Sequence, residues 1–320
     1  MSRVLITGAA GFLGSNLARY FLNQNYQVIG VDNYLTGSRD NIVDLELDKD
    51  FSFVFHDVTS PLYLDEGLDG VLHLASPASP VDYLKHPIET LQVGSIGTQN
   101  MLIIAEAKAC RFLLASTSEV YGDSKVNPQS ENYWGNVNPV GPRSVYDEAK
   151  RYAEALTMAH NRTLGVEVRI ARIFNTYGPR MRIRDGRVVS NFIVQALRGE
   201  PLTVYGDGTQ TRSFCYVDDE VDGLFRLFQS ELTGPINIGN PSEVHVVALA
   251  ELIIKMTNSE SRLHFVELPE DDPQVRNPDI SLAESLLGWT PKTSLEEGLV
   301  KTIEFFRGTL RDSRLDPQGD

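Results

Sequence analysis

Cysteine is scarce in this chain of 320 residues, and so is histidine. The two cysteines, Cys110 and Cys215, have no CxxC spacing, which argues against a zinc knuckle or a disulfide framework. The six histidines show no HxH or HExxH spacing, so no metal site is predicted. Two isolated thiols are typical of the reducing cytoplasm, where we expect the protein to act.

Long hydrophobic runs are also lacking. The longest uncharged stretch, residues 90–105, contains two glutamines, an asparagine and two glycines. It is shorter than the roughly 20 apolar residues that a membrane span requires. The N-terminus enters an apolar run directly after Arg3, without the pattern of a signal peptide. We therefore expect no membrane partner.

Basic residues are outnumbered, with 29 lysines and arginines against 43 acidic residues and a net charge of -14. A body this acidic is a poor partner for nucleic acid, so none is expected. The charge is uneven, however. Residues 169–212 hold eight arginines, no lysine and three acidic residues, a local net charge of +5. We expect this segment to lie where a small anionic ligand enters.

Short apolar runs alternate with helical patterns in the first half of the chain. Strands are predicted over residues 4–6, 28–31, 51–55, 71–74, 112–115 and 166–170, and helices over residues 12–22, 90–108 and 145–164. This alternation predicts an α/β fold with a doubly wound parallel sheet of the Rossmann type. After about residue 175 the elements shorten, which predicts a smaller C-terminal substrate-binding domain over the carboxyl edge of the sheet.

A glycine-rich turn follows the first predicted strand. Gly8, Gly11 and Gly14 are spaced GxxGxxG and lead into a helix, the arrangement that binds a dinucleotide diphosphate at a helix N-terminus. The second strand ends at Asp32, 18 residues beyond Gly14. A carboxylate there accepts hydrogen bonds from the adenosine ribose and repels a 2′-phosphate, which favours NAD over NADP. The alternative is that Asp32 is only a turn residue.

A tyrosine and a lysine, Tyr146 and Lys150, stand four apart on one predicted helical face. A nearby ammonium lowers the pKa of a phenol, so Tyr146 is predicted to take the proton of an alcohol while hydride leaves for nicotinamide. The preceding strand ends at Thr117, followed by Ser118 and Glu119. Thr117 is expected to hold the substrate oxygen, and the other two to supply a hydrogen bond and an acid or base. A capping and turn cluster is the alternative.

Together these residues resemble the extended short-chain dehydrogenase/reductases that act on nucleotide sugars. Longer strings are similar to the UDP-glucuronate decarboxylases, also called UDP-xylose synthases. These strings lie at residues 73–80, 116–122, 133–139, 141–144, 172–181 and 185–192. The resemblance extends from Arg3 to about Phe306. Because the chain lacks the N-terminal extension of membrane-anchored members, it resembles the soluble kind.

The resemblance implies an NAD-binding domain over residues 1–174 with a return segment near 213–245, and a domain over 175–320 that mainly binds the nucleotide sugar. Its reaction would oxidise UDP-glucuronate at C4, release carbon dioxide from the resulting β-keto acid, and reduce the ketone to give UDP-xylose. NAD would be recycled. A homodimer is also implied, through the helices near 90–108 and 145–164.

The resemblance and the motifs assign the site residues as follows. The catalytic residues are Thr117, Ser118, Glu119, Tyr146 and Lys150. The NAD-binding residues are Gly8, Gly11, Phe12, Leu13, Gly14, Asp32, Asn33, Asp57, Val58, Leu74, Tyr146 and Lys150. The residues for the UDP-sugar are Tyr83, Asn175, Arg180, Asn191, Thr203, Tyr205, Arg212 and Arg276. Arg276 is expected to bind a carboxylate or phosphate in the sugar pocket, as guanidinium groups do well.

Other functions are consistent with parts of this pattern. A nucleotide-sugar 4,6-dehydratase begins with the same C4 oxidation, and some members carry a Thr-Ser-Glu triplet. Arg276 and the loop at residues 75–80 favour decarboxylation instead. A 4-epimerase has no need for a glutamate at position 119. A noncatalytic NAD-binding regulatory protein would be expected to have lost Tyr146 or Lys150.

Overall fold

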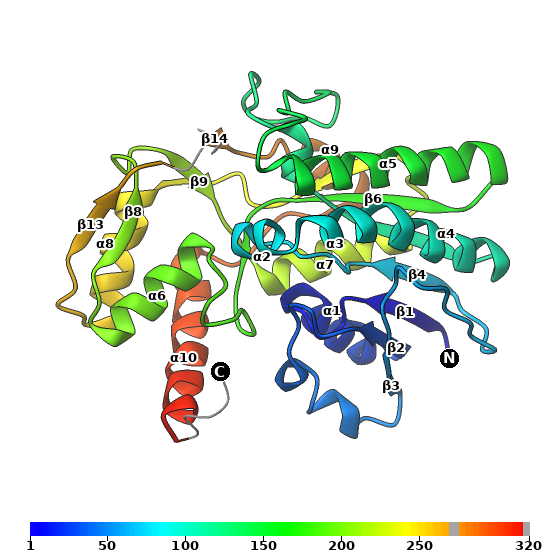
Figure 1. Ribbon diagram of the computed structural model, residues 1–320, viewed down its shortest axis with the longest axis horizontal. Coiled ribbons are helices and arrows are strands. Elements are labelled where there is room, and N and C mark those ends of the chain that lie inside the picture. The colour runs from blue at the N-terminus through cyan, green and yellow to red at the C-terminus, as the bar shows by residue number, and fades with distance from the viewer. Residues whose placement is uncertain (269–274, 316–320) are drawn as a thin grey trace.

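Seven parallel strands form the central sheet of the protein, which we describe from a computed structural model covering residues 1–268 and 275–315 (Figure 1). The strand order is β11-β6-β5-β4-β1-β2-β3. The bounds are β1 Arg3–Thr7, β2 Gln27–Asp32, β3 Phe51–Phe55, β4 Gly70–His73, β5 Arg111–Thr117, β6 Val168–Ile173 and β11 Pro235–Ile238. The order reverses between β1 and β4, where open α/β sheets bind ligands at their carboxyl edge. The predicted doubly wound fold is confirmed.

Helices cover both faces of the sheet. Val4 and Ile6 of β1 belong to the apolar cluster that contains Phe21 of α1 (Phe12–Asn23). Leu5 points the other way, into the cluster that contains Met101 of α4 (Thr98–Ala107). Successive side chains of a strand alternate between faces, so a strand with two covered faces must be apolar throughout. For this reason, the central strands appear in the sequence as continuous apolar runs.

One predicted helix contains an irregular turn. The pattern at residues 90–108 forms α3 (Pro87–Gln92), a π-helical turn over Val93–Gly97, and then α4. Gly94 lies in the turn, and a Cβ there would come within 2.7 Å of the Cβ of Ala149 on α5 (Ser144–Leu164). The turn therefore lets two helices approach closely, which the local apolar spacing could not reveal.

The smaller part of the molecule is built from short strands and longer helices. The strands are β7 Thr176–Tyr177, β8 Leu202–Tyr205, β9 Thr211–Ser213, β10 Cys215–Tyr216, β12 Glu243–His245, β13 Leu263–Val266 and β14 Val275–Arg276. Its helices are α6 Val188–Arg198, α8 Val246–Thr257 and α10 Leu295–Leu315, whereas α2 Pro80–Lys85, α7 Val217–Gln229 and α9 Ser281–Leu287 pack on the sheet or its helices. Within the described ranges, no helix is both long and apolar enough to cross a membrane.

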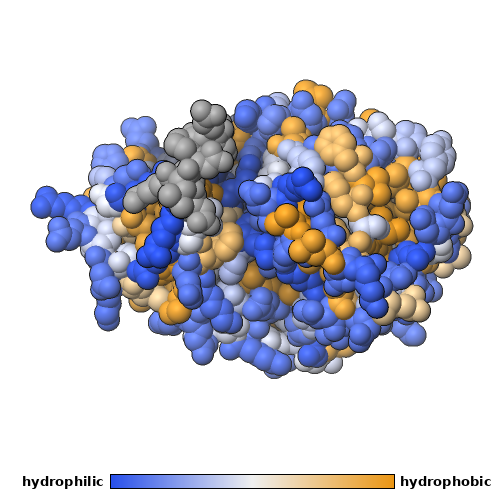
Figure 2. Space-filling model, turned by 90° about the horizontal axis from the view of Figure 1, so that it is seen from below, coloured by the Kyte–Doolittle hydropathy of each residue, from blue (hydrophilic) through white to orange (hydrophobic). Residues whose placement is uncertain are grey.

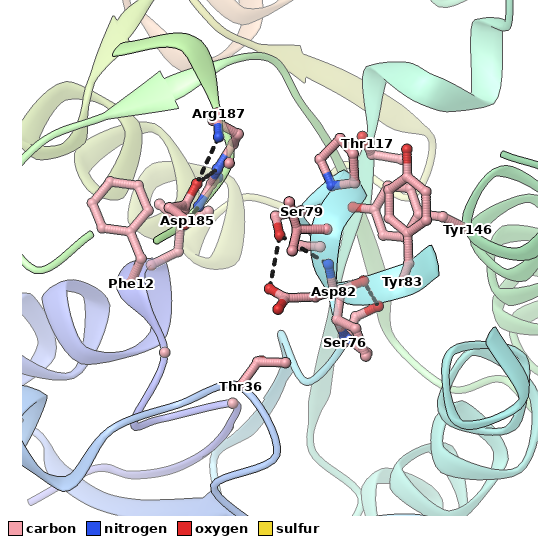
Figure 3. Close-up of a pocket in the computed structure, with 18 of the residues that line it drawn as sticks. Phe12, Thr36, Ser76, Ser79, Asp82, Tyr83, Thr117, Tyr146, Asp185 and Arg187 are labelled. Atoms are coloured by element: carbon pink, nitrogen blue, oxygen red, sulfur yellow. Dashed lines mark hydrogen bonds and ion pairs between the residues drawn. The ribbon is translucent and has the colours of Figure 1, made fainter. Parts of the chain in front are cut away.

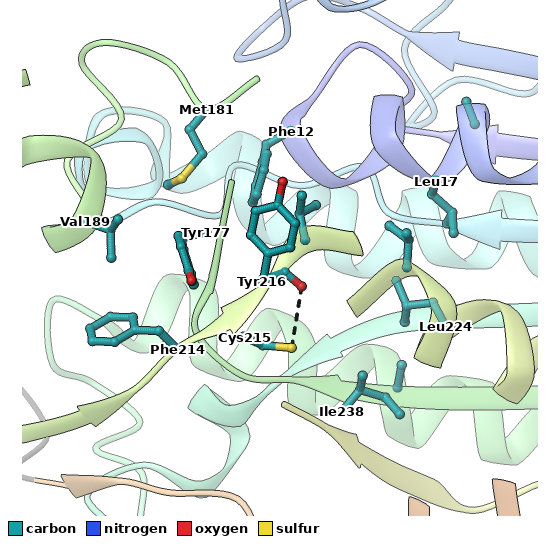
Figure 4. Close-up of a cluster of buried hydrophobic side chains, with 14 of the residues drawn as sticks. Phe12, Leu17, Tyr177, Met181, Val189, Phe214, Cys215, Tyr216, Leu224 and Ile238 are labelled. Carbon is teal, nitrogen blue, oxygen red and sulfur yellow. Dashed lines mark hydrogen bonds between the residues drawn. The ribbon is translucent and has the colours of Figure 1, made fainter. Parts of the chain in front are cut away.

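A shared core fixes this smaller part against the sheet. Met181, Val189 and Phe214 lie in the same buried cluster as Leu17 of α1 and Leu224 of α7 (Figure 4). The core is thus continuous from the strands β7 and β10 to the helices on the sheet. Since close-packed interiors resist deformation, the elements that line the edge of the sheet are held in place from both sides.

Candidate active site

A cavity of about 760 Å³ lies at the carboxyl edge of the sheet. On the face shown in Figure 2 the surface is hollowed near its middle, with strongly hydrophilic residues in the hollow. The cavity volume is in the range of ligand pockets. Every residue predicted for catalysis, cofactor or substrate lines it, and these are Gly8, Gly11, Phe12, Leu13, Gly14, Asp32, Asn33, Asp57, Val58, Leu74, Tyr83, Thr117, Ser118, Glu119, Tyr146, Lys150, Asn175, Arg180, Asn191, Thr203, Tyr205, Arg212 and Arg276. Residues predicted from separate motifs are therefore neighbours around one space.

The glycine turn joins β1 to α1 and has no room for side chains. Gly8 has a φ of +70°, and a Cβ there would lie 2.9 Å from the backbone nitrogen of Ala75. Gly11 is the N-cap of α1, and no side chain caps this helix. The first N–H groups of α1 and its positive dipole end are thus left for an anion.

Gly14→Ala should destabilise the protein, because its Cβ would lie 2.0 Å from the carbonyl oxygen of Gly8. Both atoms belong to or adjoin backbone, so relief requires the turn to open. We expect a loss of about 3 kcal/mol in the free energy of unfolding, measured by denaturant titration. Gly308→Ala, inside α10 with no atom within 4 Å of its Cβ, is the control and should gain about 0.5–1 kcal/mol. Equal stability of the two variants would contradict this account of the turn.

The carboxylate of Asp32 closes the other side of the turn. Its two oxygens accept backbone N–H bonds from Ala10 at 3.0 Å and Tyr34 at 2.8 Å. Burial raises the pKa of Asp32 and outweighs these bonds. Asn33 donates to Asp57 at 3.1 Å, which links the ends of β2 and β3 beside it. The polar groups predicted to hold the adenosine half of a dinucleotide therefore lie together at the ends of β2 and β3.

Tyr146 and Lys150 lie on the face of α5 that packs against β5. Tyr146 and Thr117 both line the cavity, and the Thr117 hydroxyl is near enough to the phenol to influence its pKa. Lys150 donates to the carbonyl oxygen of Ala115 at 2.9 Å, and its Nζ lies 5.8 Å from the centroid of the Tyr146 ring. Tyr83 of α2 stacks on Tyr146, with ring centroids 5.2 Å apart and planes 7° from parallel (Figure 3).

The predicted lowering of the Tyr146 pKa by Lys150 is not what this structure has. Burial raises the pKa of Tyr146 well above its ordinary value, although the nearby hydroxyl of Thr117 opposes the change. Burial also lowers the pKa of Lys150 to about 8. Both side chains are only 6% exposed, and loss of hydration disfavours the charged form of each. Burial therefore favours the neutral phenol at Tyr146.

Glu119, predicted to supply an acid or base, is held by two arginines. It lies in the helical turn Ser118–Tyr121 after β5, and its Oε2 accepts from Arg143 and from Arg276, each at 2.8 Å. Burial alone would raise the pKa of Glu119, but these two guanidinium groups outweigh it and lower the pKa to about 2. Glu119 is thus a fixed carboxylate at neutral pH.

Arg276 is held in place by more than Glu119. Its Nη1 donates to the carbonyl oxygen of Gly122 at 2.5 Å, and it is only 2% exposed. In the parallel pair of β9 and β14, Arg276 is the Cα partner of Arg212. The two predicted anion-binding arginines therefore lie on paired strands and both line the cavity, although 64 residues separate them in the sequence. Guanidinium groups suit a diphosphate or a carboxylate.

Sequence reasoning missed several cavity residues. They are Arg143, which pairs with Glu119, and the ion pairs Arg182–Asp82 and Arg187–Asp185. The guanidinium of Arg187 lies 5.5 Å from the centroid of the Phe12 ring, beside the glycine turn (Figure 3). The local excess of arginine marked Arg182 and Arg187, and the string at residues 141–144 contained Arg143. Nothing in these patterns showed their acidic partners.

The arginine-rich segment lines the cavity only in part. Of its eight arginines, Arg180, Arg182, Arg187 and Arg212 are lining residues. Arg169 instead donates to the carbonyl oxygen of Ser230 at 2.7 Å. Half of these arginines therefore lie where the ligand is expected to enter. Arg169 and Arg172 lie within β6 and make buried structural contacts instead.

A glycine turn on the first strand of a parallel sheet, with a tyrosine and a lysine one helical turn apart beside it, defines an extended short-chain dehydrogenase/reductase. The chain belongs to the GDP-mannose 4,6 dehydratase family, whose sequence profile matches residues 5–302. This bears out the resemblance found in the sequence.

Relatives within this group are decarboxylases and epimerases. UDP-glucuronic acid decarboxylase 6 of Arabidopsis thaliana is 55% identical over 306 residues, covering 95% of this chain and 89% of that protein. UDP-glucuronic acid decarboxylase 1 of Xenopus tropicalis is 53% identical over 308 residues, covering 96% of this chain and 73% of that protein. UDP-glucuronic acid 4-epimerase from Bacillus cereus, solved with UDP-glucuronic acid and NAD, has a TM-score of 0.86 at 30% identity, covering 96% and 99% of the two chains.

Proposed function

We propose that this protein is an NAD-dependent decarboxylase that converts UDP-glucuronate to UDP-xylose and carbon dioxide. One observation carries the proposal. The Tyr146–Thr117 pair and the Arg212–Arg276 pair open into the same cavity, so an alcohol and an anionic group of one ligand can be held together. The identity of 53–55% to proteins named UDP-glucuronic acid decarboxylase supports the choice of substrate.

The residues present fit NAD. The uncapped start of α1 suits a diphosphate, and the carboxylate of Asp32 is placed for a ribose diol. The ammonium group of Lys150 would bind the nicotinamide ribose. The neighbouring epimerase that was solved with NAD supports this cofactor. A bound NAD would supply the acceptor for the C4 hydride and the donor for the later reduction.

The chain's own groups then move protons and hold charge. Tyr146 would take the proton of the sugar 4-hydroxyl, with Thr117 orienting the oxygen. The C4 ketone leaves the carboxylate on C5 in the β position, so the C–C bond can break with its electrons flowing to the C4 oxygen. Thr117 and Tyr146 are placed to stabilise that oxygen. C5 then gains a proton, and Tyr146 returns its proton to O4 as the ketone is reduced.

Arg276 would act on the anionic groups of the sugar, with Glu119 holding its guanidinium in position. Three of its N–H groups are engaged by Glu119 and Gly122, and a guanidinium has five. The remaining donors are available to a carboxylate.

We also propose that the chain is divided into an NAD-binding part, 1–174 with 213–245, and a part within 175–320 that mainly binds the nucleotide sugar.

The test is a stoichiometry. Purified protein with UDP-glucuronate and NAD should release one carbon dioxide per UDP-xylose, without net accumulation of NADH. A 4,6-dehydratase would instead turn over UDP-glucose or GDP-mannose and eliminate water, and an epimerase would return UDP-galacturonate with no gas. Turnover of either neutral sugar, with UDP-glucuronate unchanged, would refute the proposed reaction.

We further propose that the protein acts as a homodimer in the cytoplasm. Apolar side chains are exposed on neighbouring helices, with Ile88 of α3 61% exposed and Ile103 of α4 49% exposed. Such a surface on α3 to α5 supports pairing with a second copy. The free thiols of Cys110 and Cys215 support a reducing compartment. Sedimentation equilibrium should give twice the mass of one chain, and a single-chain mass at micromolar concentration would exclude the dimer.

A further inference from the structure

Glu154 continues the catalytic face of α5. Tyr146, Lys150 and Glu154 are spaced four residues apart, so their side chains lie one above another along the helix. We propose that Glu154, with Arg172 of β6, is a positioning pair that sets α5 against β5 and so holds Tyr146 in place. The proposal rests on the function proposed above, because its main readout is turnover.

The carboxylate of Glu154 is engaged at both oxygens. Arg172 binds it in a fork, with Nε 2.9 Å from Oε1 and Nη2 2.8 Å from Oε2. The hydroxyl of Ser116 donates to Oε1 at 2.6 Å. The side chains of Glu154 and Arg172 are only 13% and 12% exposed. A bidentate pair that is shielded from water fixes both distance and orientation.

Arg172 is itself anchored from several elements. Its Nη1 donates to the hydroxyl of Tyr121 at 3.0 Å and to the carbonyl oxygen of Glu131 at 3.1 Å, and its guanidinium lies 4.8 Å from the centroid of the Tyr121 ring. Tyr121 donates in turn to Asn237 of β11 at 2.7 Å. Glu154 therefore attaches α5 to a polar network that spans β5, β6 and β11.

Contacts between α5 and the end of β5 fix the position of the helix along the strand. Lys150 donates to the carbonyl oxygen of Ala115, Glu154 accepts from the hydroxyl of Ser116, and Tyr146 faces Thr117. Three consecutive residues of the strand thus meet three side chains on one face of the helix. Of these, only Glu154 supplies a buried charge pair. Without it, we expect α5 to shift slightly against β5 and to displace the Tyr146 phenol relative to Thr117.

The expected effect is on the rate and not on binding. A misplacement of about 1 Å at a reacting group can cost about 100-fold in rate. Glu154→Ala should lower kcat by about 10- to 100-fold, while KM for UDP-glucuronate and the Kd for NAD stay within about twofold. Glu154→Gln keeps an acceptor for Ser116 but turns an NH₂ group toward Arg172, so an intermediate kcat is expected. Unchanged kcat in Glu154→Ala would overturn the proposal.

Glu148→Gln is the matched control. It removes a carboxylate from the same helix, but one whose pair with Arg151 is 3.5 Å long and 38% exposed. An exposed pair contributes little, so kcat and Tm should match the unmodified protein. If that unmodified protein does not release carbon dioxide from UDP-glucuronate, the proposed function fails. If it does while Glu154→Ala is equally active, only the positioning role fails.

A double variant separates positioning from stability. Glu154→Ala leaves the Arg172 charge buried without its partner, which is expected to lower Tm. Glu154→Met with Arg172→Met removes both charges, and apolar replacement of a buried pair is often neutral in stability. We expect Tm to return toward that of the unmodified protein while kcat stays low. Recovery of kcat together with Tm would mean that the pair acts only through stability.

Discussion

Tyr146→Phe is expected to lower kcat for UDP-glucuronate by about 10²- to 10⁴-fold, because the variant has no group to take the proton from the 4-hydroxyl. The aromatic ring would remain, so the stacking on Tyr83 and the fit of α5 against β5 should persist. KM and the Kd for NAD should therefore change little. In a single-turnover experiment, the transient absorbance of NADH at C4 oxidation should be absent or very slow.

The control is Tyr152→Phe, which makes the same chemical change on the same helix. Tyr152 is 51% exposed, away from the cavity lining, so its kcat should equal that of the unmodified protein. A Tyr146→Phe variant with nearly full kcat would assign the proton to another group. A loss of carbon dioxide release with a normal NADH transient would instead place Tyr146 after oxidation.

Local sequence patterns predicted the fold because the type and the ends of most strands and helices depend on nearby residues. The centre of strand β1, residues 4–6, is continuously apolar, and its end is marked by Gly8, where a φ of +70° favours glycine. The π-helical turn at Val93–Gly97 is not visible in the apolar spacing. Its Gly94 lies against Ala149, which reaches it only in the folded chain. No spacing within one segment reports such a contact between segments.

The membership of the site was predictable, but its electrostatics were not. Motifs marked Glu119 and Arg276, which are 157 residues apart, yet they did not show that the two form an ion pair. The pKa of Glu119 follows from that pairing and from Arg143, and it makes an acid role untenable at neutral pH. Burial likewise decides the pKa of Lys150. Desolvation is a property of the packed molecule, and a four-residue spacing carries no information about it.

Arg276→Ala is the second change with a large expected effect. It removes the donors that would bind the sugar's anionic group, so KM for UDP-glucuronate should rise by about 10- to 100-fold. The Kd for NAD should change much less, since the glycine turn and Asp32 line the cavity from other elements. Titration calorimetry with NAD and steady-state kinetics with the sugar measure the two effects separately.

The same variant should also lose stability, and the loss should depend on pH. Glu119 would keep Arg143 but lose its second guanidinium, which we expect to cost about 3 kcal/mol at neutral pH. The folded pKa of Glu119 is about 2, below the ordinary value of 4.5. The ion pair therefore stabilises the fold fully above pH 4.5, and this contribution is lost as the pH falls toward 2.

The difference in Tm between the unmodified protein and Arg276→Ala should accordingly be largest near pH 7 and shrink between pH 4.5 and the acid limit of folding. Arg198→Ala is the control, because it removes one positive charge from the exposed end of α6 and should leave Tm nearly unchanged. A difference that stays constant as the pH falls would assign the stability of Arg276 to its bond with Gly122, and a normal KM would remove Arg276 from the sugar pocket.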